Sequence, residues 1–200
     1  MNATQLKIIG IVSMTIDHIG YFLFPQMTVL RVIGRLAYPI FAYMIAEGCR
    51  YTRNKARYFC MVLAIACACS TAAYFAERSL YQSIFTTFSC AMLLIFALDV
   101  AAKTAERARI IRWGASAVML TFLYFAVFQL QMIPGFETDY GFLGIITPVI
   151  AWLGRSKAEK LLGLTVGLCL LSAELGAVQF CSLAAVALLY FYNGKRGNHN

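Results

Sequence analysis

Residues 6–25, LKIIGIVSMTIDHIGYFLFP, form an apolar run that is long enough to cross a bilayer as one helix. Asp17 and His18 lie inside this run, and Lys7 lies near its start. Because hydrocarbon tolerates ionisable groups poorly, such groups in a membrane span usually mark a functional site. On a helix, the step from Lys7 to His18 makes three turns with roughly 20° left over, so the two side chains share one face about 16 Å apart. The run therefore predicts a first transmembrane helix that carries a base and a cation along one line.

The rest of the chain is equally apolar, with 61% hydrophobic and 13% charged residues among its 200. No segment shows the two-residue alternation of a barrel strand, and backbone groups in lipid must bond within their own helix. We therefore expect an all-α, polytopic transmembrane helix bundle of about eight spans, or six or seven with a re-entrant piece. The expected spans are about 6–24, 34–50, 56–76, 82–101, 110–128, 140–154, 161–174 and 178–193. One integral-membrane domain, 1–193, is expected to precede a polar tail, 194–200.

The distribution of lysine and arginine predicts the orientation of these spans. All but three of the 17 cations are expected on one side of the membrane, in loops, in the tail or near the ends of spans, and the exceptions are Arg31, Arg35 and Arg78. Cytoplasmic loops are rich in such residues, so both termini are expected to be cytoplasmic. Topology thus explains the net charge of +8, and we expect no nucleic-acid partner. Most of the seven cysteines lie within apolar runs without histidine neighbours, which favours packing roles, and we expect no metal.

His18 is the candidate catalytic base, since imidazole takes up and returns a proton near neutral pH. Asp17 is a second catalytic candidate, because a carboxylate beside the ring stabilises its charged form. Neighbouring residues on a helix point about 100° apart, however, so Asp17 is equally able to cap another helix or to pair with an arginine. A buried polar pair that only holds helices together is the structural alternative.

The stretch from residue 31 to 55, RVIGRLAYPIFAYMIAEGCRYTRNK, contains the next candidates. Arg35 and Tyr38 lie at a depth where their side chains are able to stabilise a tetrahedral intermediate formed near His18. Glu47 is an isolated carboxylate in an apolar helix. Glu47 could form an ion pair with Arg50 or Arg53, or it could take part in substrate binding or proton handling.

Arg50 and Arg53, with Lys55 and Arg57, form a basic patch where two predicted helices meet the cytoplasm. Anchoring by positive charge explains the patch, but arginine forks on neighbouring turns also bind phosphate. Together with Lys7 they suit coenzyme A, whose phosphates lie at one end of a long arm and whose thioester lies at the other. The basic loop from Lys103 to Arg112 has no such neighbours and is expected to be topological.

Three stretches carry a resemblance to a known family: residues 6–25, residues 30–58 (LRVIGRLAYPIFAYMIAEGCRYTRNKARY) and residues 140–152 (YGFLGIITPVIAW). They resemble the TraX family of bacterial membrane proteins, named for a protein that acetylates the amino terminus of pilin. The spacing from Lys7 to His18 is similar to a basic-x10-His signature of membrane-integral acyltransferases, whose histidine is regarded as catalytic. Arg50-x-x-Arg53 resembles their cytoplasmic paired arginines. The resemblance implies an acetyl-CoA-dependent N- or O-acetyltransferase in the bacterial inner membrane.

Other functions stay open at this stage. A small proton- or cation-coupled transporter would use Asp17, His18 and Glu47 as a relay, and a structural membrane subunit would use none of them. The acceptor of an acetyl group is not indicated, and a peptide amino terminus, a glycan and a small amine are all compatible with the sequence. Membrane lipid is an expected partner, and a homo-oligomer is possible.

Overall fold

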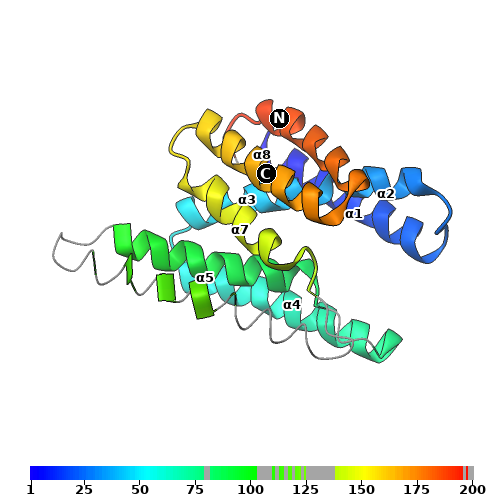
Figure 1. Ribbon diagram of the computed structural model, residues 1–200, viewed down its shortest axis with the longest axis horizontal. Helices are drawn as coiled ribbons and strands as arrows, with labels where there is room; N and C mark the ends of the chain where they lie inside the picture. Colours follow the sequence, from blue (N-terminus) through cyan, green and yellow to red (C-terminus); the bar gives the residue numbers. More distant parts are fainter. Residues whose placement is uncertain are drawn as a thin grey trace. The chain divides into compact units, whose positions relative to one another are not determined.

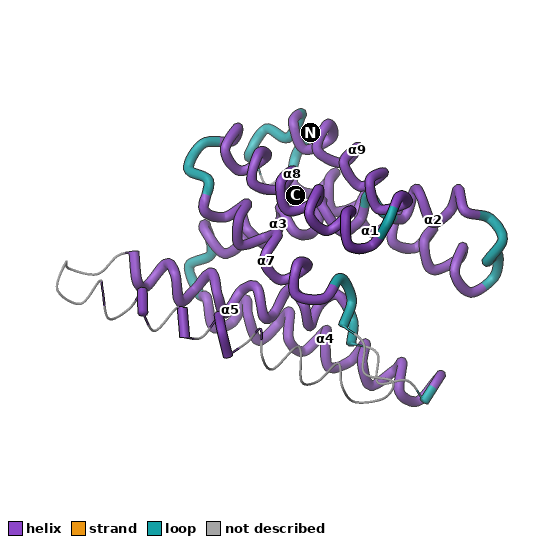
Figure 2. The backbone as a smooth tube through the Cα atoms, viewed as in Figure 1, coloured by secondary structure: helices purple, strands orange, loops and turns teal. Residues whose placement is uncertain are grey.

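The computed structural model describes residues 1–78, 82–102, 138–195 and 197, and isolated positions between 110 and 124. Within these residues the secondary structure is helical, and the one β-type contact is an isolated bridge between Gln82 and Thr138 (Figure 2). The all-α prediction is therefore confirmed for the described part of the chain. The expected span 110–128 lies largely outside these residues.

The helices follow the expected apolar segments closely. They are α1 (Ala3–Phe22), α2 (Thr28–Gly34), α3 (Ala37–Tyr51), α4 (Lys55–Glu77), α5 (Ile84–Ala102), α7 (Gly141–Leu153), α8 (Lys157–Leu175), the 3₁₀ helix η1 (Ala177–Leu183) and α9 (Ala184–Tyr190) (Figure 1). Three segments are long and apolar enough to cross a membrane: Thr28–Tyr51, Lys55–Phe75 and Ile84–Ala102. This finding supports the interpretation as a membrane protein. The expected number of about eight spans stays a prediction.

Polar side chains at the helix starts explain where several helices begin. The Asn2 side chain accepts a hydrogen bond from the Gln5 N–H, and the Gln5 side chain accepts one from the Asn2 N–H, so α1 starts with a reciprocal cap. The Ser156 hydroxyl oxygen caps α8 by accepting a hydrogen bond from the Glu159 N–H. Hydrogen bonds from the Arg155 N–H and the Ser156 hydroxyl lower the pKa of the exposed Glu159 carboxyl.

The chain forms two compact units, Met1–Ile45 with Ile150–Asn200, and Ala46–Val149. In the first unit α1 packs against α2, and η1 packs against α2, α8 and α9. The chain ends meet there, because the Ala3 N–H donates to the Lys195 carbonyl and the Asn193 N–H donates to the Met1 carbonyl, both at 2.9 Å. The two ends of the described chain therefore lie on the same side of this unit.

In the second unit α4 packs against α5. The Lys55 ammonium at the start of α4 pairs with the Asp99 carboxylate near the end of α5, so the two helices run in opposite directions. Near the other end of α4 and α5, the Ser70 hydroxyl donates to the Gln82 side chain, and the Thr87 hydroxyl donates to the Asp139 carbonyl at 2.8 Å. The Lys55–Asp99 and Ser70–Gln82 contacts thus connect α4 to α5 or to the residues just before it, and the Thr87 bond connects α5 to the residues just before α7.

Candidate functional site

The expected alignment of Lys7 and His18 requires one unbroken helix, and α1 is continuous from Ala3 to Phe22. Both side chains are exposed, on a face that also presents Ile11 and Thr15. The opposite face of α1, with Leu6, Gly10, Ser13 and Gly20, is buried in the first unit. Lys7 and His18 therefore share a line on the outer surface of α1, as the spacing predicts.

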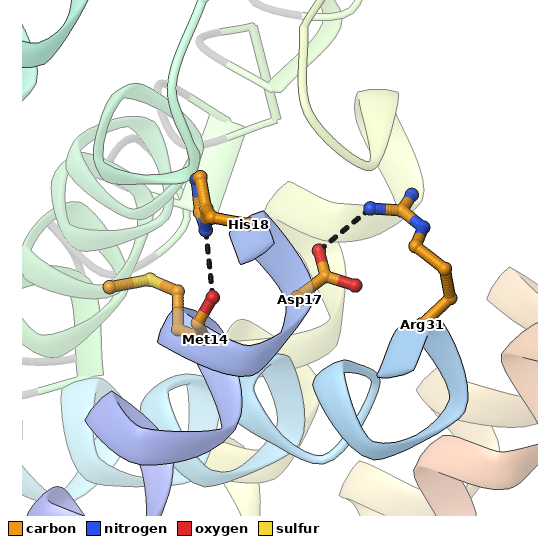
Figure 3. A network of polar contacts seen from close by, with 4 residues as sticks. All are labelled: Met14, Asp17, His18 and Arg31. Carbon is orange, nitrogen blue, oxygen red and sulfur yellow. Dashed lines mark hydrogen bonds and ion pairs between the residues drawn. The ribbon is translucent and has the colours of Figure 1, made fainter. Parts of the chain in front are cut away.

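The geometry at His18 fixes which ring nitrogen is able to act as a base. Nδ1 lies 2.7 Å from the Met14 carbonyl oxygen, one turn earlier on α1 (Figure 3). Because a carbonyl only accepts, Nδ1 carries the hydrogen, and Nε2 of the neutral ring has the free lone pair. The Phe22 ring lies one turn later, with its centroid 6.3 Å from that of the imidazole. The Met14 carbonyl thus holds the ring in one tautomer, and Nε2 has no hydrogen-bond partner among the residues that the structure describes.

Asp17 points away from His18 and pairs with an arginine of α2, the alternative that the sequence left open (Figure 3). Its Oδ2 accepts a hydrogen bond from a terminal guanidinium nitrogen of Arg31 at 3.0 Å. The Asp17 and Arg31 side chains are 22% and 28% exposed, so the pair is largely removed from the solvent. The Arg31 guanidinium also lies 5.2 Å from the centroid of the Tyr21 ring. Asp17 therefore joins α1 to α2, and the structure shows no direct contact between its carboxylate and the imidazole.

Gly34 makes this pairing possible, because the Asp17 side chain packs directly on it. A Cβ atom at position 34 would lie 2.3 Å from both Cβ and Oδ1 of Asp17. Gly20 has the same role one turn beyond Asp17, where an added Cβ would lie 2.7 Å from Cβ of Leu30. The small residues thus let α1 and α2 approach closely, as is common between helices in membranes.

We expect Gly34→Ala to lower the free energy of unfolding by about 1–3 kcal/mol, because the added methyl group displaces Asp17 from Arg31. Thermal unfolding of the purified protein in detergent measures this loss. Gly114→Ala is the control, since the described residues place no heavy atom within 4 Å of a Cβ at that position. Equal unfolding midpoints for the two variants would contradict the close packing at Gly34.

The other predicted site residues lie at different depths. Arg35 caps the end of α2 and is half-buried, and Tyr38 in the first turn of α3 is fully buried. Both belong to the first unit, with Lys7 and His18. Glu47 is 9% exposed and belongs to the second unit. Tyr38 and Glu47 are thus polar side chains buried in the protein, and Arg35 is partly exposed.

The basic patch differs from its expected form. Arg50 lies in the last turn of α3, whereas Arg53 lies outside any helix, in the link of residues 52–54. The two arginines therefore do not occupy neighbouring turns of one helix, because α3 ends at Tyr51 and Asn54 already caps α4. Lys55 pairs with Asp99 and lies 5.2 Å from the Phe96 ring centroid, whereas Arg53 is exposed.

Sequence reasoning did not name Arg31 as the partner of Asp17 or Asp99 as the partner of Lys55. The sequence does indicate the first pair. Asp17 precedes the link of residues 23–27 between α1 and α2 by about as many residues as Arg31 follows it. Two helices that pack side by side after a short link bring such positions together. The second pair joins residues 44 positions apart, and no local pattern indicates it.

Three apolar helices long enough to cross a membrane, together with a largely buried ion pair between α1 and α2, are features of polytopic membrane proteins. The sequence matches the TraX protein family over residues 2–198, so the chain belongs to that family. It is also 50% identical, over 52 residues, to an uncharacterized protein of Rickettsia prowazekii (strain Madrid E). That match covers 26% of this chain and 21% of the relative, so the aligned part spans about a fifth of the relative's length. No solved structure matches this chain.

Proposed function

We propose that this protein is a membrane-embedded acyltransferase that moves an acetyl group from cytoplasmic acetyl-CoA to an acceptor amine or hydroxyl. The observation that carries the proposal is the geometry of His18, whose Nδ1–H is bound by the Met14 carbonyl and whose Nε2 is open. Membership of the TraX family over residues 2–198 supports the same chemistry. Acetylation of a pilin amino terminus is the activity for which this family is named, and it is one form of the proposed reaction.

In the proposed step, Nε2 of His18 takes the proton of the acceptor while the acceptor nitrogen or oxygen attacks the thioester carbonyl. The tetrahedral intermediate then expels the sulfur of coenzyme A, the C–S bond breaks, and the imidazolium returns its proton to the leaving thiolate. The products are the acetylated acceptor and coenzyme A. Arg35 and Tyr38 are the proposed donors to the oxyanion of the intermediate. Arg35 is half-buried, whereas the fully buried Tyr38 would have to turn toward the exposed His18 to donate as well.

The cationic residues Lys7, Arg50 and Arg53 are proposed to bind the phosphates of coenzyme A. Lys7 lies on the His18 face of α1 and is exposed, as a phosphate ligand must be. Arg53 is also exposed and is attached to a short link, where its guanidinium has freedom to form a fork with a phosphate. Glu47 lies one turn before Arg50 on α3 and is proposed to contribute to binding beside that arginine.

The proposed topology has about eight spans, with both termini on the cytoplasmic side of the bacterial inner membrane. It is supported by the meeting of the chain ends through Met1, Ala3, Asn193 and Lys195. Lys157 lies at the same end of the unit, because its ammonium donates to the Tyr190 and Tyr192 carbonyls. The charge rule assigns this loop and both termini to one side, and the contacts agree with that assignment.

We expect Arg50→Ala combined with Arg53→Ala to raise the dissociation constant for coenzyme A by about tenfold or more, since charge-assisted contacts to phosphate are lost. Equilibrium binding of labelled acetyl-CoA to the purified full chain in detergent measures this constant. Arg107→Ala combined with Arg109→Ala is the control, because it removes the same charge from the stretch that the sequence predicts to be a separate, purely topological basic loop.

An unchanged affinity in the Arg50 and Arg53 double variant would remove these arginines from the coenzyme A site. A wild-type protein without any affinity for acetyl-CoA would contradict the acyltransferase itself. In that case, proton flux through reconstituted vesicles would test the transporter, in which Asp17, His18 and Glu47 handle protons.

A further inference from the structure

The buried side of η1, called its polar edge below, carries polar residues, whereas the buried side of the following helix α9 carries apolar residues. Gln179 is 1% exposed and Ser182 is fully buried, and they are three residues apart on a 3₁₀ helix. Residues at this spacing eclipse each other on a 3₁₀ helix, about 6 Å apart along the axis. On α9 the buried positions are Ala185 and Leu189. The helical segment from 177 to 190 thus changes from a polar to an apolar buried edge along its length.

Both side chains of this polar edge are unsatisfied within the described part of the chain. Oε1 and Nε2 of Gln179 and Oγ of Ser182 are buried, and none has a hydrogen-bond partner. Nearby, Ser172 is equally buried, but its hydroxyl donates to the Leu168 carbonyl at 2.7 Å. Buried polar atoms in native proteins are almost always bonded to protein, water or a ligand, so these three atoms require a partner that the described residues do not supply.

The polar edge lies against the helices that build the first unit. η1 packs on α8 and on α2, and α2 carries the Arg31 that holds Asp17. The outward residues of η1, Val178 and Phe180, are exposed, so the two polar side chains are directed into the packed side of the helix. The missing partner would therefore occupy the interior of the unit, beside α2 and α8.

The chemistry of the side chains restricts the partner to an uncharged group. A carboxamide offers a donor and an acceptor, and a serine hydroxyl offers both as well. Neither neutralises a charge, and a charge buried among neutral groups is strongly unfavourable. We infer that Gln179 and Ser182 form a binding site for an uncharged hydroxyl- or amide-bearing molecule. This site goes beyond the proposed acyl transfer and does not depend on it.

The test uses the full chain in lipid nanodiscs and four small probes that each contain a four-carbon chain. Butyl glucoside supplies uncharged hydroxyls and N-butylacetamide supplies an uncharged amide, whereas butylamine and butyrate are charged. We expect at least one uncharged probe to raise the thermal unfolding midpoint of the wild type and to slow hydrogen exchange over residues 176–184. The responses to the two uncharged probes distinguish a hydroxyl ligand from an amide ligand.

Gln179→Met removes both amide atoms at nearly constant length, so we expect the dissociation constant for the effective probe to rise about tenfold or more. Without probe, this variant is expected to unfold at the wild-type temperature or about 2–4 °C above it, because an unpaired buried amide is lost. Ser182→Ala gives a second, smaller change if Gln179→Met does not fold. Ser172→Ala is the matched control and is expected to keep the full response, since its hydroxyl already has a partner.

Three results would overturn the site. They are the absence of a response of the wild type to both uncharged probes, an equal response to the charged probes, and a full response in Gln179→Met or, if that variant does not fold, in Ser182→Ala. A failure to bind acetyl-CoA would leave these readouts unaffected, because none of them uses acetyl transfer.

Discussion

His18→Ala is expected to reduce acetyl transfer about 100-fold or more while leaving acetyl-CoA binding unchanged, because general-base catalysis supplies an effect of this size. The variant removes the open Nε2 and also the Nδ1–H that binds the Met14 carbonyl. The exposed position of His18 means that little packing is lost. Incorporation of labelled acetyl into inner-membrane vesicles that contain the chain measures transfer, and equilibrium binding of acetyl-CoA to the purified protein measures affinity.

Two further variants separate catalysis from structure at this position. Added imidazole is expected to restore part of the transfer in His18→Ala, since the exposed site leaves room for a free base beside α1. Thr15→Ala is the matched control on the same face, one turn earlier, where the hydroxyl only donates to the Ile11 carbonyl. Full transfer in His18→Ala would exclude the imidazole as the base, and an equal loss in Thr15→Ala would indicate damage to the helix face.

Hydropathy predicted the helices well because apolar length is a local property of the sequence. The expected segments 56–76 and 161–174 correspond to α4 (Lys55–Glu77) and α8 (Lys157–Leu175) within a few residues. The expected segment 34–50 lies inside the candidate span Thr28–Tyr51, which starts six residues earlier and contains the short break between α2 and α3. Gly34 is the last residue of α2 before this break, and Pro39 lies in the first turn of α3, where proline is tolerated.

The partners of the polar residues were harder to predict, because they depend on helix packing. The spacing from Lys7 to His18 needs only one helix, and the structure places both on one face of α1. The pairing of Asp17 with Arg31 needs the close approach that Gly34 permits, which no single segment encodes. The polar edge at Gln179 was missed for a similar reason, since helical spacing alone does not distinguish a 3₁₀ turn from an α-helical turn.

Asp17→Asn is expected to lower the free energy of unfolding by about 2–3 kcal/mol, because Arg31 loses a charge-assisted hydrogen bond in a largely buried site. The Arg31→Met single variant is expected to cause a similar loss, since it leaves the Asp17 carboxylate unpaired. The double variant Asp17→Asn with Arg31→Met is expected to be more stable than the sum of the two losses predicts. Thermal and denaturant unfolding of the purified protein measures all three.

Charge reversal is not expected to rescue this pair, although both charges would be retained. The Asp17 side chain lies directly against Gly34, with no space for the longer side chain of an arginine at position 17. Asp17→Arg combined with Arg31→Asp should therefore be less stable than the double variant with Asn and Met. A strictly electrostatic contact would give the opposite order.

The same variants decide whether Asp17 acts on the imidazole or on the helices. If its carboxylate only joins α1 to α2, Asp17→Asn lowers the unfolding midpoint but leaves the dependence of acetyl transfer on pH unchanged. A carboxylate that tuned His18 would instead shift that profile, because the charged form of the ring would lose its stabilisation. Since Oδ2 of Asp17 bonds Arg31 and Nδ1 of His18 bonds the Met14 carbonyl, we expect the unshifted profile.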